Sequence, residues 1–346
     1  MRALTISAHG GLEQVEYRTD LAIPEPGAGC VRVKLQAAAL NHLDLWVVRG
    51  VPGVSITPNW VLGADGAGMI DAVGSNVPAR YAVREGDRVV INPGVAAADD
   101  AYVKRGEEPL SPSFGVLGEH QPGTLAEYTC VPAKNVRTIP ASIPDDIAAA
   151  FTLSTITAWR MCVTRAVVSA GDEVLIWGIG GGVALAALAI CKARGARVWV
   201  TSSSDDKLAR ARMLGADETL NHGKVDVGRE VRARTNKRGV TVVLDSVGSA
   251  TWRHSLAALG RGGRLVTCGG TSGAMVETDV RRLFWNQWTL MGSTMGTDAE
   301  FDAITQELVA GRLTAVVDST FPLERGRDAL ARLERGEQFG KIVVRI

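Results

Sequence analysis

The sequence lacks closely spaced cysteine pairs. Its five cysteines are scattered along the chain and form no C-x-x-C motif. An odd number of separated cysteines argues against a complete disulfide framework. Because free thiols persist in reducing compartments, we expect a cytoplasmic protein. The cysteines are Cys30, Cys130, Cys162, Cys191 and Cys268.

An excess of charge of one sign and a long apolar run are also missing. Lys and Arg total 38 against 37 for Asp and Glu, a formal net charge of +1. Nucleic acids and anionic membranes attract proteins through an excess of positive charge. The longest apolar stretch, residues 183–191, ends at Lys192, and a membrane-spanning helix needs about 20 residues. We therefore expect neither nucleic acid nor membrane among the partners, and a small-molecule substrate instead.

The pattern of apolar residues changes along the 346 residues. The first third alternates in short stretches broken by Pro and Gly, which predicts mainly antiparallel strands. Between about 151 and 296, strand-like runs alternate with helical stretches. Such alternation predicts an α/β fold, a doubly wound parallel sheet with helices on both faces. Strands are expected at 173–177, 197–201, 240–244, 264–268 and 289–293, and helices at 183–194, 205–214 and 251–259.

The tail, residues 316–346, returns to β character. It contains a helix-like stretch near 327–335 and a closing apolar strand at 341–346. We place this tail on the first domain.

Glycine is abundant, with 39 residues, and one cluster follows the first predicted strand of the alternating region. There the chain places Gly178, Gly180, Gly181 and Gly182 before Val183 and an amphipathic helix. A dinucleotide-binding fold needs glycine at this junction for the sharp turn and for close approach of the pyrophosphate. The cluster therefore predicts a dinucleotide site.

The end of the second predicted strand bears on which nicotinamide cofactor binds. An NAD site places an acidic residue there, whereas a 2'-phosphate repels carboxylates and needs donors. Here the chain has Ser202, Ser203 and Ser204, and Lys207 follows one helical turn later. This favours NADPH over NADH. In the alternative interpretation, Ser204 or Asp205 only caps the next helix and Lys207 is a surface charge.

Several further segments occur in a family-specific order: GADGAG at 63–68, REGDRV at 84–89, GTLAEY at 123–128, DSVG at 245–248 and GRGGRLV at 260–266. With the glycine turn, they make the chain resemble the medium-chain dehydrogenase/reductase superfamily, which includes zinc alcohol dehydrogenases and quinone oxidoreductases. The resemblance implies a GroES-like β-barrel catalytic domain, residues 1–150 with 297–346, and a Rossmann dinucleotide-binding domain, residues 151–296.

The zinc ligands of that superfamily are missing at the aligned positions. The resemblance places the three catalytic ligands at Asn41, Ala64 and Leu153, of which two carry no donor atom. A shifted site at His42 and Asp65 is conceivable but lacks a third ligand. The four cysteines of the structural zinc lobe align with Ala97, Asp100, Val103 and Ser111. We therefore expect no zinc, and a lobe packed by residues such as Tyr102 and Leu110.

The missing metal bears on the reaction. Oxidation of a simple alcohol would lack its Lewis acid, whereas reduction of an activated double bond needs only donors for an enolate oxygen. The segment Asn41-His42-Leu43-Asp44 resembles the zinc-free branch of NADPH-dependent quinone and enone reductases. The alternatives are a metal-independent alcohol or aldehyde dehydrogenase that uses His42 and Asp44, and an NADPH-binding protein that has lost its chemistry.

The resemblance also implies site residues. Asn41 would orient substrate or ribose, His42 would contact pyrophosphate or relay protons, and Asp44 would orient His42; each has a structural alternative. The nicotinamide would lie near Thr157, near Cys268, Gly269 and Gly270, and near Ser293, Thr294 and Met295. Flat substrates could stack on apolar walls, for which the candidates are Trp46, Trp60, Phe284 and Trp285. A homodimer is expected through the apolar strand 289–293, since the superfamily commonly extends its cofactor sheet across a two-fold axis.

Overall fold

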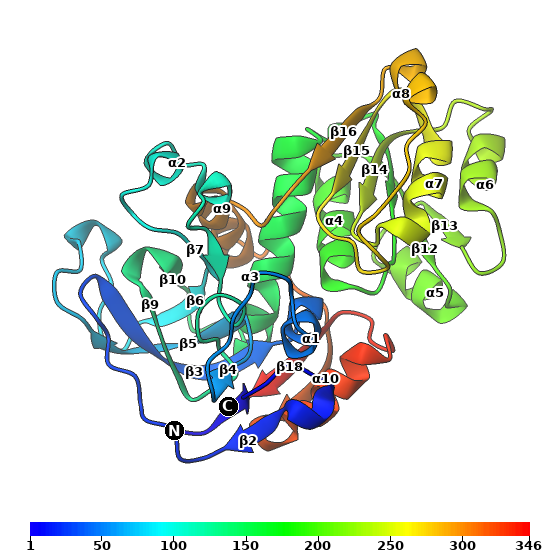
Figure 1. The fold of residues 1–346 in the computed structure, drawn as a ribbon. Helices are drawn as coiled ribbons and strands as arrows, with labels where there is room; N and C mark the ends of the chain where they lie inside the picture. The colour runs from blue at the N-terminus through cyan, green and yellow to red at the C-terminus, as the bar shows by residue number, and fades with distance from the viewer. The chain divides into compact units, whose positions relative to one another are not determined.

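The computed structural model describes residues 1–346, and these form two compact units (Figure 1). One unit contains Met1–Ser154 and Gly296–Ile346, and the other contains Thr155–Met295. The sequence pattern places the first boundary at 150/151 and the second at 296/297. The observed boundary after Ser154 lies within helix α3 (Asp145–Trp159). A continuous helix leaves no turn signal, so its sequence does not mark the junction.

The first unit is built around a seven-stranded sheet with the order β10-β6-β5-β3-β18-β17 and β9 also paired to β3. Its longest pairing joins β3 (Cys30–Ala39) and β5 (Asp65–Val73) in antiparallel register. Strand β18 (Lys341–Arg345) pairs antiparallel with the end of β3, with Val343 opposite Ala39. This pairing brings the start of the last strand next to the end of β3, where the candidate site begins.

The other elements of this unit are short. The strands are β1 (Ala3–Ile6), β2 (Glu16–Arg18), β4 (Trp60–Val61), β6 (Arg88–Ile91), β7 (Gly94–Val95), β8 (Gly115–Val116), β9 (Tyr128–Pro132), β10 (Val136–Thr138) and β17 (Val317–Pro322). The helices are α1 (His42–Arg49), α2 (Ala101–Lys104), α9 (Asp298–Val309) and α10 (Gly326–Glu334).

The second unit contains a six-stranded parallel sheet with the order β13-β12-β11-β14-β15-β16. The order reverses between β11 and β14, the place where open α/β sheets bind ligands at the carboxyl ends of their strands. The predicted α/β class, with a Rossmann-like parallel sheet, is confirmed. The strands of this unit are β11 (Glu173–Ile176), β12 (Arg197–Ser202), β13 (Glu218–Asn221), β14 (Val240–Asp245), β15 (Leu259–Thr267) and β16 (Thr289–Gly292). Its helices are α4 (Gly182–Ala193), α5 (Asp205–Met213), α6 (Val227–Arg234), α7 (Ser249–Ala258) and α8 (Val280–Asn286).

Some elements of this sheet differ from the sequence prediction. Strand β15 begins at Leu259 rather than 264, because Leu259 already pairs with Val240. The pairing resumes at Arg264, opposite Val242, so the glycine-rich segment 260–263 forms an irregularity within the strand. Strand β13 and helices α6 and α8 were not predicted. Their sequences are short and polar, or lack apolar spacing, so neighbours in the fold determine them.

One helical segment, Asp145–Arg165, is long and apolar enough to cross a membrane by length and composition alone. It contains α3 and the π-helical turn Arg160–Arg165. Of its most apolar window, 67% lies buried inside the structure. Core helices of globular domains have the same property, so the segment is weak evidence for a membrane span.

Candidate functional site

Asn41 lies where β3 ends and begins helix α1 as its N-cap residue. Its backbone N–H donates to Oδ2 of Asp44 over 2.7 Å. Asp44 is only 2% exposed, and this burial raises its pKa to about 7. Its carboxyl group thus closes the first turn of α1 rather than orienting His42, which is exposed. The prediction that Asp44 orients His42 is therefore corrected in favour of its capping alternative.

The side chain of Asn41 belongs to a buried network with Asp65 and Lys341. Nζ of Lys341 donates to Oδ1 of Asn41 over 2.5 Å and to Oδ2 of Asp65 over 2.8 Å. Nδ2 of Asn41 also donates to Oδ2 of Asp65, over 2.9 Å. The side chains of Lys341 and Asp65 are 5% and 0% exposed. The three groups therefore form a closed triangle, in which one cation and one anion are held out of water.

Asp65 is fully satisfied within this network. Its Oδ1 accepts from Oγ1 of Thr152 over 2.6 Å and from the backbone N–H of Leu153 over 2.7 Å. With the two bonds to Oδ2, the carboxylate accepts four hydrogen bonds, as many as its lone pairs allow. A buried ion pair is stable only when the remaining polar capacity is also used. Asp65 therefore fixes Lys341 and Asn41 in one geometry.

The residues at the aligned catalytic zinc positions do not fit a zinc ion. Ala64 is fully buried and offers no donor, and both ends of the Asn41 amide are already bonded, its oxygen to the Lys341 ammonium. Leu153 contributes a backbone N–H to Asp65. Nowhere in the chain do three His, Cys, Asp or Glu side chains converge as a metal site requires.

The lobe aligned with the structural zinc site is held by hydrogen bonds. Asp100 caps α2 by accepting from the N–H of Tyr102 over 2.7 Å. Oγ of Ser113 lies 2.7 Å from Oγ of Ser111 and accepts from the N–H of Ala97 over 3.0 Å. Leu110 is 56% exposed, so the expectation that it packs the lobe is wrong. Short-range hydrogen bonds hold the backbone of the lobe instead.

The glycine turn between β11 and α4 fits a dinucleotide pyrophosphate. Gly178 and Gly180 have φ values of 68° and 126°, which side-chain-bearing residues rarely adopt. Gly181 begins α4 without a side-chain cap, so the helix start is open to an anion. A Cβ atom built on Gly178 or Gly181 would meet nothing closer than 3.8 Å. Space and N–H groups are thus available together.

The serines after β12 have different surroundings. Ser202 is 5% exposed and its Oγ accepts from the N–H of Ser204 over 3.1 Å. Ser204 caps α5 by accepting from the N–H of Lys207, as the alternative interpretation expected. Ser203 is exposed. The nearby Asp205 forms an exposed ion pair with Lys224.

The predicted nicotinamide residues lie at or near the ends of β15 and β16, on loops and at α3. Cys268, Gly269 and Gly270 follow β15, and Ser293, Thr294 and Met295 follow β16. Oγ of Ser293 is buried without a hydrogen-bond partner. Oγ1 of Thr157, on α3, lies 3.8 Å from Sδ of Met295. The orphaned hydroxyl of Ser293 is compatible with a polar ligand group at these strand ends; contact with the nicotinamide stays a prediction.

The four aromatic candidates for a substrate wall are distributed over both units. Trp60 lies in the core of the first unit, and its Nε1 donates to the carbonyl of Gly118 over 2.8 Å. Its assignment to an open wall is therefore corrected to a core position. Trp46 is partly buried on α1. Phe284 and Trp285 are 63% and 70% exposed on α8 of the second unit, and a stacking role for these three stays a prediction.

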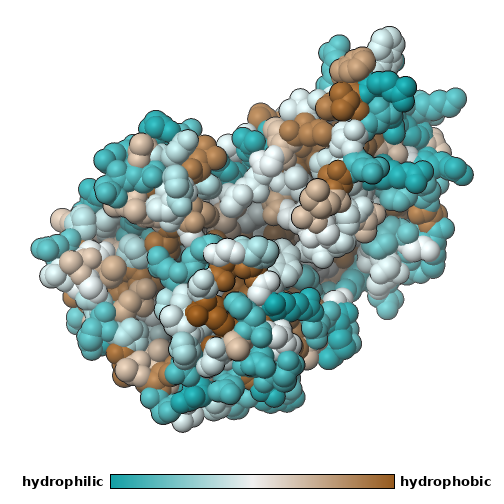
Figure 2. Space-filling model, in the orientation of Figure 1, coloured by the Kyte–Doolittle hydropathy of each residue, from teal (hydrophilic) through white to brown (hydrophobic).

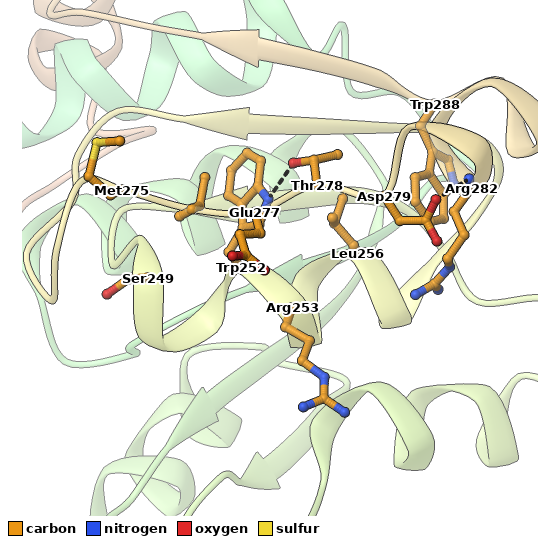
Figure 3. A pocket seen from close by; sticks show the side chains of 11 residues that line it. Ser249, Trp252, Arg253, Leu256, Met275, Glu277, Thr278, Asp279, Arg282 and Trp288 are labelled. Carbon is orange, nitrogen blue, oxygen red and sulfur yellow. Dashed lines mark hydrogen bonds between the residues drawn. The ribbon is translucent and has the colours of Figure 1, made fainter.

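A cavity of about 520 Å³ lies in the second unit between α7, the segment 275–279 and α8. Figure 3 shows Trp252 on one side and Trp288 with Arg282 on the other. Nε1 of Trp252 donates to Oγ1 of Thr278 over 3.0 Å, which ties the segment to α7. None of the predicted site residues lines this cavity.

Comparison with known proteins places both parts of the chain in families. Residues 27–141 match the alcohol dehydrogenase GroES-like domain, and residues 182–310 match the zinc-binding dehydrogenase family. Human (Homo sapiens) quinone oxidoreductase is 27% identical over 99% of this chain and 97% of its own length. Zinc-type alcohol dehydrogenase-like protein YogA of Leptosphaeria maculans is 31% identical over 98% and 97%.

Among solved structures, an NAD-dependent alcohol dehydrogenase is 40% identical, with full coverage of both chains and a TM-score of 0.94. Sequence and fold therefore agree over the whole length of the chain. Lys341 and Asp65 are the members of the buried network with Asn41 that sequence reasoning missed or underrated. No local signal marks Lys341, which opens an apolar strand 300 residues after Asn41. The chain belongs to the medium-chain dehydrogenase/reductase superfamily, and it is an oxidoreductase of the kind for which a nucleotide cofactor is expected.

Proposed function

We propose that the chain is an NADPH-dependent reductase of quinones or conjugated carbonyl compounds that works without catalytic zinc. The observation that carries this proposal is the network in which Asn41, at one of the aligned catalytic zinc positions, is bonded to Asp65 and Lys341. An ammonium group bonded to the Asn41 oxygen is incompatible with a metal cation bound by the same oxygen. The similarity to human quinone oxidoreductase supports the same class of substrate.

The chemistry proposed for the site has simple requirements. NADPH supplies a hydride to the β-carbon of the acceptor. The protein has to bind the cofactor, hold the acceptor and stabilise the negative charge that develops on the carbonyl oxygen. The turn at Gly178 and Gly180 would hold the pyrophosphate. Because the network around Asp65 is rigid, it would offer polar groups in a fixed geometry, which is what such stabilisation needs.

The preference for NADPH is supported by the residues that follow β12. The first carboxylate after β12 is that of Asp205, three residues beyond the end of the strand, whereas NAD sites hold an acid at the strand end itself. Ser202 and Ser203 carry hydroxyl groups, of which that of Ser203 is exposed, and the exposed carboxylate of Asp205 forms an ion pair with Lys224. A 2'-phosphate would therefore meet hydroxyl groups at the strand end, where an NAD site would present a carboxylate.

A second candidate function is oxidation of an alcohol or reduction of an aldehyde. The 40% identical NAD-dependent alcohol dehydrogenase favours it. In that case His42, exposed at the start of α1, would be the available acid or base. Turnover of allylic or benzylic alcohols with NADP⁺ or NAD⁺, without added zinc, would favour this candidate.

One experiment separates the proposals. NADPH and NADH consumption is measured against a panel of quinones, enones, enoyl thioesters and aldehydes, with the metal content determined on the same sample. We expect turnover of quinones or enones with NADPH and less than one zinc per chain. Stoichiometric zinc together with alcohol turnover would overturn the proposal. Cofactor binding without any turnover would indicate a binding protein that has lost its chemistry.

We further propose a cytoplasmic homodimer with no membrane or nucleic-acid partner. Strand β16 is the edge of the parallel sheet and pairs only with β15. Beside it, α8 exposes Val280, Phe284 and Trp285, and Figure 2 shows hydrophobic surface gathered over this helix. A second copy could pair its own edge with β16 and cover these side chains.

This assembly can be tested together with the substrate-wall prediction for the same helix. We expect Trp285→Glu to shift the mass measured by light scattering from dimer to monomer. If the variant stays dimeric but loses affinity for aromatic acceptors, Trp285 belongs to the substrate site instead.

A further inference from the structure

The cavity beside α8 lies wholly within the second unit, and the proposed reaction does not use it. Its volume of about 520 Å³ is that of a pocket for a small organic molecule. Its walls are helix α7, the segment 275–279 and helix α8 with Trp288 (Figure 3). The glycine turn that would hold the pyrophosphate does not line it. The cavity is therefore a candidate site for a ligand other than the dinucleotide.

The cavity has a fixed apolar wall and an exposed apolar rim. In the wall, Leu256 is 5% exposed, and the indole of Trp252 is held by the bond from its Nε1 to Oγ1 of Thr278. At the rim, Met275 and Val276 are 89% and 39% exposed. Covering exposed apolar side chains is favourable, and a flat ring packs well against an indole. The cavity therefore suits a ligand with a flat apolar body.

Arg282 adds a positive charge that has no counter-charge. Its guanidinium lies over the ring of Trp288, with Cζ 5.4 Å from the centroid, and no carboxylate lies within ion-pair distance of it. Trp288 is fixed in turn, because its Nε1 donates to the carbonyl of Gly260 over 2.7 Å. Burial, and after it the charge of Arg282, lowers the pKa of Arg232 on α6. Two guanidinium groups thus repel each other here, and an anion beside Arg282 would relieve the repulsion.

The other charged residues of the cavity are engaged or lie apart. Oδ1 of Asp279 accepts from the backbone N–H groups of Arg281 and Arg282, over 2.9 and 3.3 Å, and Nε of Arg281 lies 3.6 Å from it. Glu277 is exposed and stands well apart from Arg282 in Figure 3. In the same view the guanidinium of Arg253 extends away from the other lining side chains. The charge available to a ligand is therefore that of Arg282.

We propose that this cavity binds an aromatic carboxylate, a small organic anion with a flat apolar ring. The carboxylate pairs with Arg282, whose planar guanidinium can bind both of its oxygens. The ring packs on Trp252 and Leu256 and is covered by Met275. The site does not depend on the reductase function, because it shares no residue with the cofactor turn or with the network around Asp65.

The test uses three probes that have the same ring and different charges: 2-naphthoate, 2-naphthylmethylammonium and 2-naphthalenemethanol. Isothermal titration calorimetry on the full chain at pH 7 gives their Kd values with and without a saturating nicotinamide cofactor. We expect 2-naphthoate to bind with a Kd of about 1 mM or lower, and about tenfold more tightly than the ammonium probe. The cofactor should not change its Kd. Hydrogen exchange should slow in α7 and in residues 275–282.

Substitutions on α8 locate the ligand. Arg282→Gln should weaken 2-naphthoate about tenfold, because the paired charge is lost. Arg281→Gln is the matched control, since the side chain of Arg281 is 88% exposed on the same helix and does not line the cavity. Arg282→Glu should reverse the preference, so that 2-naphthylmethylammonium binds more tightly than 2-naphthoate. A gain of this kind cannot come from misfolding, and circular dichroism confirms that each variant is folded.

Four results would overturn the proposal. The first is no binding of 2-naphthoate, and the second is an equal Kd for all three probes, which would indicate attraction of any apolar ring. Equal losses in Arg282→Gln and Arg281→Gln would indicate the general charge of α8 rather than a pairing. Displacement of 2-naphthoate by the cofactor would place it in the dinucleotide site. The reductase function is tested by turnover alone, so its failure and the failure of this site are separate results.

Discussion

The two units build their candidate sites from different materials. In the second unit the site is made of backbone: glycines with positive φ, an uncapped helix start and the ends of parallel strands. In the first unit it is made of buried charged side chains joined by hydrogen bonds. A backbone site depends on what space is left free, whereas a charged network depends on every member being present. Substitutions should therefore affect binding in one unit and folding in the other.

The largest effect is expected from breaking the buried ion pair. Lys341→Met leaves the Asp65 carboxylate, which is 0% exposed, without its counter-charge. Removing one partner of a buried pair costs about 3 to 5 kcal/mol. Urea unfolding should show this loss, and Asp65→Asn/Lys341→Met should recover much of it. Equal free energies of unfolding for Lys341→Met and the wild type would show that the pair is not a stabilising unit.

A second effect in the first unit depends on pH. The pKa of Asp44 is raised from 3.8 to about 7 by burial. The unfolded chain releases this proton first, so the stability that the neutral group contributes is complete below about 3.8 and is lost as pH rises through about 7. Asp44→Asn keeps an acceptor for the N–H of Asn41 but cannot ionise.

The matching measurement is the free energy of unfolding of both proteins at pH 5 and pH 8. We expect the wild type to lose up to a few kcal/mol more than Asp44→Asn over this interval, since one pKa unit corresponds to about 1.4 kcal/mol. Parallel pH profiles would indicate that Asp44 ionises normally in the folded protein.

In the second unit, a substitution in the turn should spare stability and remove binding. Gly181→Val adds a side chain where the nearest atom to a Cβ is 3.8 Å away. The free energy of unfolding should change little, while the Kd of NADPH should rise about tenfold or more because the pyrophosphate can no longer approach the backbone. Isothermal titration calorimetry measures this. Unchanged affinity would place the cofactor elsewhere.

The smallest effect concerns the choice of cofactor. Ser202→Asp introduces a carboxylate that can still accept from the N–H of Ser204. It should weaken NADPH by about 1 to 2 kcal/mol relative to NADH, since one added charge repels only the phosphorylated ribose. An equal effect on both cofactors would remove the assignment of the 2'-phosphate. Ser203→Asp, at the exposed neighbouring position, shows whether the effect is specific to the end of the strand.

Sequence reasoning succeeds where the chemistry is local. The glycines from 178 to 182 lie between one strand and one helix, and the alternation that predicts the sheet extends over neighbouring residues. It fails where contacts are distant. Nothing near Lys341 indicates that it will meet Asn41 and Asp65, and Trp60 offers no sign that its N–H will bond Gly118. Strand β13 has four residues, too few for a periodic signal.

The position of Lys341 on β18 has a consequence for synthesis. A ribosome produces Asn41 and Asp65 roughly 300 residues before Lys341, an interval of tens of seconds at about 5 to 20 residues per second. During that interval the barrel strands exist without the cation that neutralises Asp65. The nascent first unit therefore has to keep the Asp65 carboxylate hydrated. This carboxylate can be buried only when the last strand, with Lys341, has emerged. Ribosome-bound chains that end before Lys341 should accordingly be more sensitive to proteases in this unit than in the parallel sheet.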